Sequence, residues 1–252
     1  MDRKIHTLLL AAAAVTLAPF AAAPVALAQT AEAQPGLSDA QRLASLMSNE
    51  ERNEELFSNL IDVQMPQAVL ADPDVAFLEE NCPGSVKAML QAGRPELWRG
   101  FVEDEAEFKA GLVDIFLAYP PDHLAGMVQF FESPGGRKLF DTAFRSASYD
   151  ATLASIVANG DSMPSEDALE RDRQATERRL RDAIDPSEMA DMDYQLRTAP
   201  WYPSIMDALP KVKALRSRID TAPTTAEEDA RLDKLMMGGL TGHLKKRCGI
   251  EL

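Results

Sequence analysis

The two cysteines are the most reactive side chains in the sequence, and their positions bear on both redox chemistry and stability. Cys82 and Cys248 stand far apart along the chain and form no Cys-x-x-Cys pair, so a thioredoxin-like redox site is not indicated. An even number of cysteines in an oxidising compartment favours a disulfide. We therefore expect a Cys82–Cys248 bond, which the chain-entropy model values at about 5 kcal/mol. Two free thiols are the alternative.

Histidine and methionine side chains could together hold a soft metal ion. His123 and Met127 stand one helical turn apart, and Met189 and Met192 form a second pair of this kind. Imidazole and thioether ligands suit copper, but methionine is also a common core residue, and all three methionines fall on apolar faces. Core packing is therefore the favoured interpretation. A His-Glu-x-x-His motif is missing and zinc would have few ligands, so we expect no metal and no cofactor.

Patterns typical of hydrolases are equally weak. The Gly-x-Ser-x-Gly elbow is missing, and His123 and His243 are interpreted as surface residues. Runs of carboxylates occur at positions 79–80, 103–105 and 227–229. A glycosidase needs two acids across a cleft, one of them with a raised pKa. In so acidic a chain these runs are interpreted as solvated surface, and no catalytic residue is predicted.

The first 28 residues have the pattern of a secretory signal peptide. Basic residues at positions 3 and 4 precede an apolar run from Leu8 to Ala23, and Ala26-Leu27-Ala28 provides a small-residue cleavage site. We expect cleavage after Ala28 and a periplasmic or secreted product without a transmembrane anchor. An uncleaved anchor is the alternative.

The charge balance limits the class of partner. The sequence contains 40 Asp and Glu against 26 Lys and Arg, a formal net charge of −14. Proteins that grip nucleic acid carry a basic face, so nucleic-acid binding is not expected. The strongly charged segment at 166–182 mixes both signs and is interpreted as a solvent-exposed helix face.

Apolar residues recur at helical spacing along most of the chain, for example at Leu97, Phe101, Phe108, Leu112 and Phe116. Start and stop signals divide these stretches into helices: capping boxes at Ser38 and Ser48, Asp72-Pro73, a break at 158–165 around Gly160 and Ser165, a bend at Pro210, and a start at Thr224 or Thr225. Alternating strand patterns are missing. The sequence predicts an all-α multi-helix bundle of about eight to ten helices.

Two segments resemble each other and indicate a degenerate helical repeat. One runs from Pro121 to Pro134 and the other from Pro186 to Pro200. Each reads as a proline start, a short amphipathic helix, a break near a second proline and a longer helix. We predict a helical half at 29–160 and a second at 161–252, which form separate units or pack as one domain; chance similarity is the alternative.

The first segment also resembles a known family. The pattern Phe130-Phe131 followed by Ser133-Pro134-Gly135-Gly136-Arg137-Lys138 is similar to that of the bacterial domain of unknown function 2059. The residues that carry the resemblance are Phe130, Phe131, Ser133, Pro134, Gly136 and Lys138. His123 stands where that family usually has Glu. The resemblance implies a secreted, helical, envelope-associated protein without an established reaction.

The same motif could bind an anion at a helix N-terminus, but a structural helix junction is the favoured interpretation. We predict a secreted, helical binding or interaction protein of the bacterial envelope. Its partner would be an envelope protein, a peptide or a lipid, held in a groove between helices. The alternative is an envelope enzyme, a metal- or carboxylate-dependent hydrolase. A third hypothesis is a homo-oligomer with a structural role.

Overall fold

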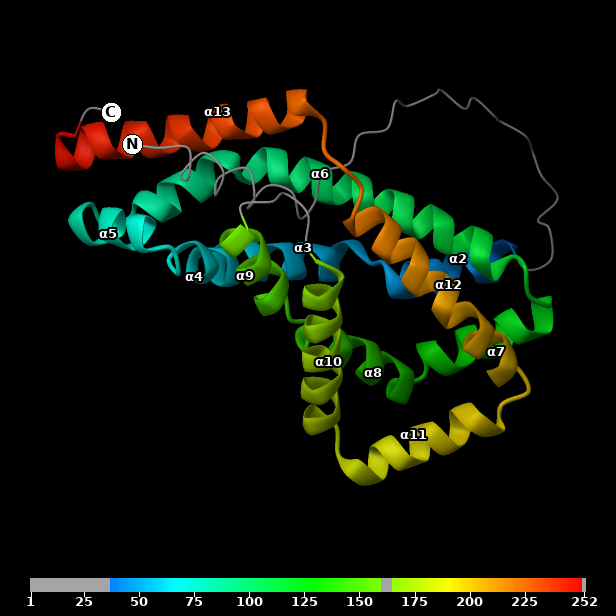
Figure 1. The fold of residues 1–252 in the computed structure, drawn as a ribbon. Coiled ribbons are helices and arrows are strands. Elements are labelled where there is room, and N and C mark those ends of the chain that lie inside the picture. The colour runs from blue at the N-terminus through cyan, green and yellow to red at the C-terminus, as the bar shows by residue number, and fades with distance from the viewer. Residues whose placement is uncertain (1–36, 160–164, 251–252) are drawn as a thin grey trace.

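The computed structural model describes residues 37–159 and 165–250, and over these ranges every regular element is helical (Figure 1). The predicted all-α multi-helix fold is confirmed. The predicted signal peptide and Gly160 lie outside the described residues. The elements are α2 (Leu37–Met47), α3 (Glu50–Asn59), η1 (Leu60–Gln64), α4 (Met65–Val69), α5 (Pro73–Asn81), α6 (Ser85–Phe116), α7 (Pro121–Glu132), α8 (Pro134–Arg145), α9 (Asp150–Asn159), α10 (Glu166–Ala183), α11 (Pro186–Thr198), α12 (Tyr202–Asp220), α13 (Ala226–His243) and η2 (Leu244–Cys248).

Helix α6 is the central element of the fold. It is 32 residues long and continues through Pro95, which is exposed. Helices α13, α2 and α12 all contact it. Figure 1 shows α13 lying along the first half of α6 and α12 crossing its second half.

The buried apolar residues form two clusters, and α6 contributes to both. The first cluster joins α3, η1, α4 and α5 to the first half of α6 and to α13, with Phe57, Leu97 and Leu232 among its members. The second joins α2 and α7 to the second half of α6 and to α12, with Leu112 and Trp201 among its members. Each cluster therefore contains residues from both predicted halves of the chain.

Small residues allow α6 and α13 to approach closely. A Cβ atom added at Gly239 would lie 2.7 Å from the backbone oxygen of Ala88 and 2.4 Å from the Cβ of Ala92. A Cβ added at Gly93 would lie 2.7 Å from Cγ of Met236. Both glycines thus leave space that the neighbouring helix occupies.

Most of the predicted helix starts are found. Asp72 accepts hydrogen bonds from the backbone N–H groups of Asp74 and Val75, Ser165 caps α10, and Thr225 forms a capping box with Glu228.

Two predicted starts are wrong. Ser38 already lies within α2, and α3 is capped by Asn49 rather than Ser48. Ser48 is buried, and its hydroxyl donates to Glu105 instead of capping a helix.

The predicted disulfide is present. Cys82 and Cys248 are joined across 166 residues, with 5.9 Å between their Cα atoms. The bond fixes η2 to the junction between α5 and α6. None of the helices in the described part of the chain is both long and apolar enough to span a membrane.

The two segments of the predicted repeat have the same order of elements. Helices α7 and α8 are separated at Ser133, and helices α11 and α12 at Ala199 to Trp201. Their burial differs, because α7 buries Leu124, Met127 and Val128 whereas α11 buries Met192. Pro210, where the sequence predicts a bend, lies inside α12.

Candidate functional site

The motif that resembles a known family forms the junction between α7 and α8. The hydroxyl of Ser133 accepts a hydrogen bond of 3.2 Å from the N–H of Gly136, and Pro134 occupies the first turn of α8. A Cβ added at Gly136 would lie 2.3 Å from the backbone oxygen of Phe130. These three residues therefore shape a tight connection between two helices.

Aromatic rings fill the inner side of this junction. The ring centroids of Phe130 and Phe131 are 5.1 Å apart, and Trp201 lies 5.6 Å from Phe130. Phe140 of α8 lies 4.9 Å from Phe131. The phenylalanines of the motif thus pack against each other and against the start of α12, which agrees with the structural interpretation of the motif.

The outer side of the junction has two shallow, open grooves. One groove, of about 700 Å³, runs along the exposed face of α8. A second, of about 490 Å³, lies between α2 and α7. Both are lined by Glu132, so they are neighbours, and we call the pair the α7–α8 groove. Its lining residues are Ser38, Gln41, Arg42, Ser45, Leu46, Asn49, Glu132, Pro134, Arg137, Lys138, Asp141, Thr142 and Arg145.

The charge of the α7–α8 groove differs in sign from that of the whole chain. Its lining contains four cationic side chains and two acidic ones. Both acids have cationic partners: Glu132 pairs with Arg42, and Asp141 pairs with an arginine of α3, each at 2.6 Å. Lys138 pairs with a glutamate of α11 at 2.5 Å. Among the described residues, Arg137 and Arg145 have no carboxylate partner, and both are exposed.

A second polar cluster lies inside the molecule and is centred on Glu105. Its carboxylate accepts hydrogen bonds from Ser48 at 2.8 Å and from Asn53 at 3.1 Å, and it pairs with Arg216. Arg216 also pairs with Asp220 at 2.8 Å. This cluster joins the α2–α3 connection, α6 and α12.

Asp104 is buried next to this cluster and has an unusual ionisation. Burial raises its pKa to about 8; Asp220, Glu107 and Glu105 act in the same direction, and Arg216 opposes them. Burial also raises the pKa of Tyr149, to about 12. Burial raises the pKa of Asp220 as well. The carboxyl groups of Asp104 and Asp220 and the phenol of Tyr149, all with raised pKa values, therefore lie around the guanidinium group of Arg216.

The carboxylate runs are thus not all solvated surface, and the expectation is wrong at several positions. Asp104, Glu105 and Glu228 are buried. Glu79 accepts hydrogen bonds from the backbone N–H groups that begin α6. Each of these acids is buried or hydrogen-bonded because another element packs against it. A run of charged residues in the sequence does not show which of its members will be covered in this way.

Asp172 in the charged segment at 166–182 is another buried acid. Its carboxylate accepts hydrogen bonds from the N–H groups of Ala151 at 2.9 Å and Thr152 at 2.7 Å. It therefore satisfies the free N–H groups at the start of α9 from a neighbouring helix. The rest of the segment is largely exposed and contains ion pairs such as Arg173–Glu170, as expected.

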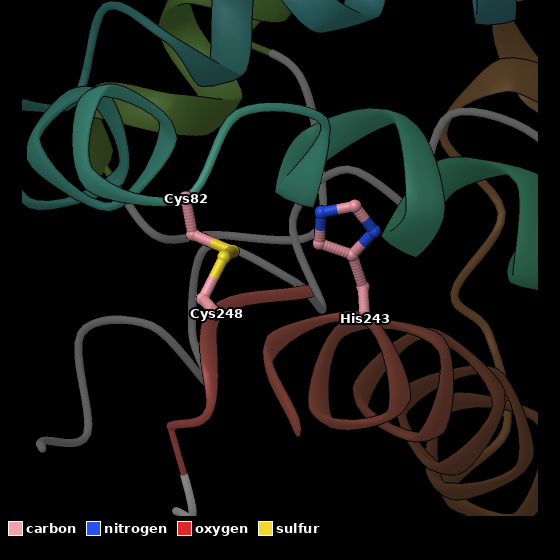
Figure 2. Close-up of side chains that lie close together, drawn as sticks. All are labelled: Cys82, His243 and Cys248. Carbon is pink, nitrogen blue, oxygen red and sulfur yellow. A yellow bond between two sulfur atoms is a disulfide. The ribbon is translucent and has the colours of Figure 1, made fainter. Parts of the chain in front are cut away.

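The histidines are half-buried and have partners. Nδ1 of His123 lies 2.8 Å from the hydroxyl of Ser204, and Nε2 of His243 lies 3.0 Å from the backbone oxygen of Pro83. Met127 and Met192 are buried, in agreement with their interpretation as core residues, whereas Met189 is only half-buried. His243 stands beside the disulfide, an arrangement that their separation in the sequence does not predict (Figure 2).

Comparison with known proteins identified no relative of this chain. No family model, curated protein or solved structure matches the chain. The resemblance of α7 and α8 to the domain of unknown function 2059 stays a prediction from its motif, and the site is interpreted from its own geometry.

Proposed function

We propose that the protein is a secreted binding protein of the bacterial envelope, and that the α7–α8 groove holds an acidic peptide segment of a partner protein. The observation that carries this proposal is a groove with excess positive charge on a chain whose net charge is −14. Arg137 and Arg145 supply two exposed guanidinium groups without carboxylate partners among the described residues. Guanidinium groups bind carboxylates with two parallel hydrogen bonds.

The lining of the groove favours a peptide over a lipid chain. Serine, threonine, asparagine and glutamine make up much of its wall, with Leu46 and Pro134 as apolar members. An acyl chain or the apolar face of a partner helix needs a mostly apolar groove. An extended peptide instead uses backbone hydrogen bonds, which these polar side chains can satisfy.

The cluster around Asp104 is the observation that favours the alternative of a carboxylate-dependent hydrolase. A carboxylic acid with a raised pKa can serve as a general acid. Asp104 and Glu105 do not line the α7–α8 groove, however, and the oxygens of Glu105 are engaged by Ser48, Asn53 and Arg216. The cluster is therefore better explained as a connection between helices, and the binding function is preferred.

The proposal is tested by crosslinking in intact source cells. A photoreactive residue replaces Thr142 in the groove, and the captured proteins are identified by mass spectrometry, with a strain lacking the protein as background. The variant Arg137→Glu/Arg145→Glu should reduce capture of a specific partner about tenfold, because it reverses both unpaired charges.

The matched control is Arg178→Glu/Arg181→Glu on α10, which makes the same change of charge at two exposed arginines outside the groove. It should retain capture. Equal loss in the two variants, or equal retention, would contradict an acidic ligand in this groove. Self-links alone, with a dimer in light scattering, would favour the oligomeric alternative.

A further inference from the structure

Three potential metal ligands meet at one end of the molecule. Cys82 lies between α5 and α6, Cys248 ends η2, and His243 is the last residue of α13. One ligand atom from each lies within 4.8 Å of the others. Within residues 37–159 and 165–250, no other group of three or more Cys, His, Asp or Glu side chains has its ligand atoms this close together. Figure 2 shows the imidazole ring beside the two bonded sulfurs.

We propose that Cys82, His243 and Cys248 form a redox-gated site for a soft metal ion, closed while the disulfide is intact and open when it is reduced. Bonded sulfurs do not act as thiolate ligands, so the oxidised protein has only the imidazole to offer. Two thiolates and one imidazole are ligands that Zn²⁺ and Cu⁺ accept readily and that Mg²⁺ and Ca²⁺ do not.

The spacing of the three groups fits a tetrahedral ion. With Zn–S bonds of 2.3 Å, the two sulfurs of a tetrahedral site lie about 3.8 Å apart. Breaking the disulfide lets the two sulfurs move apart. The imidazole nitrogen already lies within 4.8 Å of both sulfurs, close to the separation of two ligand atoms bound to one ion. Small side-chain rotations therefore suffice, and the fourth position of the ion stays open to water.

The histidine must exchange one interaction for another. In the oxidised protein, Nε2 of His243 lies 3.0 Å from the backbone oxygen of Pro83 and donates a hydrogen bond to it. Binding a metal through Nε2 moves that proton to Nδ1 of the same ring. The hydrogen bond to Pro83 is then replaced by a coordinate bond.

The surroundings suit a site that contains negatively charged sulfur ligands. Lys246 and Arg247 are exposed next to Cys248, and their positive charges offset negative charge on its sulfur. Cys82 is buried, where an isolated thiolate would be costly. A divalent ion bound by two thiolates and a neutral imidazole leaves no net charge at the site.

The reaction has two balanced steps. A dithiol reductant transfers two electrons and two protons to the Cys82–Cys248 disulfide, giving two thiols and the oxidised reductant. A divalent ion then binds to both sulfurs and to His243, and the two thiol protons go to solvent.

Cobalt(II) provides a direct probe, because coordination by thiolate gives a charge-transfer absorption band. The mature protein is reduced, freed of reductant under inert gas and titrated with Co²⁺, followed by competition with Zn²⁺. We expect one Co²⁺ per chain with thiolate absorption, displaced by Zn²⁺, and no such band in the oxidised protein.

The variant His243→Ala distinguishes a site with three ligands from metal binding by the two thiols alone. It should bind Co²⁺ at least about tenfold more weakly, whereas His123→Ala, which removes the other histidine of the mature chain, should bind like wild type. Equal affinity in His243→Ala, binding by the oxidised protein, or no thiolate band would overturn the proposal.

Loss of the disulfide could itself disturb the fold, so helix content is recorded by circular dichroism before and after metal is added. If reduction lowers the helix content, Zn²⁺ should restore it in wild type and in His123→Ala but not in His243→Ala. Failure of Zn²⁺ to restore wild type would equally contradict the proposal.

Discussion

Gly136 and Asp104 are two positions at which the surroundings tightly limit the choice of side chain. At Gly136 the limit is space, because backbone atoms of α7 stand where a Cβ would be. At Asp104 the limit is charge, because a buried carboxyl lies among other acids. The effects of substitution at the two positions should therefore differ in kind as well as in size.

Gly136→Ala should destabilise the protein by about 1–3 kcal/mol or more, since the backbone of α7 must shift to admit a methyl group. Gly135→Ala is the matched control. Its added Cβ would lie 3.8 Å from Met192, an ordinary contact distance, so it should be neutral or slightly stabilising. Urea unfolding measures both, and a similar loss in the two variants would show that the close approach to Phe130 is not the cause.

Asp104 should make the stability depend on pH. Its folded pKa of about 8 lies above the ordinary value of 3.8, so between these values the folded protein keeps a proton that the unfolded chain releases. The free energy of unfolding contributed by this group therefore falls as the pH rises from about 4 to about 8.

Asp104→Asn removes this dependence, because an amide does not ionise. It should match wild type near pH 4 and exceed its stability at about pH 8 by on the order of 1–3 kcal/mol. Urea unfolding at the two pH values gives the result. Glu103→Gln, at an exposed neighbour on α6, is the control. A difference between Asp104→Asn and wild type that is the same at both pH values would refute the assignment.

At the scale of elements, the contact between α6 and α13 depends on small side chains. Gly239 faces Ala88 and Ala92, whereas Gly238, one position earlier, has nothing within 4 Å of its added Cβ. The two adjacent glycines therefore differ only in the face of the helix that they occupy.

Gly239→Ala should lower the stability by about 1–3 kcal/mol, because the new Cβ meets the backbone oxygen of Ala88 at 2.7 Å. Gly238→Ala should instead raise it by up to about 1 kcal/mol through helix propensity. Thermal unfolding followed by circular dichroism compares them. Opposite signs are expected, and equal signs would mean that α13 does not pack on α6 in this register.

Helix limits could be predicted from the sequence where the signal is local. Asp72, Ser165 and Thr225 cap the helices that follow them, and each hydrogen bond spans two or three residues. The burial of Glu105 and Asp172 could not be predicted in this way. Their covering elements are distant in sequence, as Arg216 is from Glu105, and only the fold brings them together.

The same distinction applies to the candidate sites. The motif at the junction of α7 and α8 could be found in the sequence because its residues, 130 to 138, are close together in the chain. The meeting of His243 with Cys82 was not, because it depends on how α13 lies along α6.

At the scale of the whole molecule, the Cys82–Cys248 bond closes a loop of 166 residues that contains most of the described helices. Cys82→Ala/Cys248→Ala should lower the free energy of unfolding by about 2–4 kcal/mol, mainly because the unfolded chain gains freedom. This is the range usually measured for disulfides, and it lies below the value of about 5 kcal/mol that the chain-entropy model gives. Urea unfolding of the variant and of oxidised wild type tests this. Wild type reduced in metal-free buffer should resemble the variant, and no loss in either would contradict a stabilising role.

The place of α6 in both apolar clusters has a consequence for local opening. Amide hydrogens along α6 should exchange with solvent only when the whole protein unfolds, because neither cluster can open without it. Helix α11 buries Met192 alone among its residues, so its amides should exchange through small, independent fluctuations. Hydrogen exchange followed by mass spectrometry would then show one slow central helix and a fast α11. A fast-exchanging segment within α6 would mean that the two ends of the molecule unfold separately.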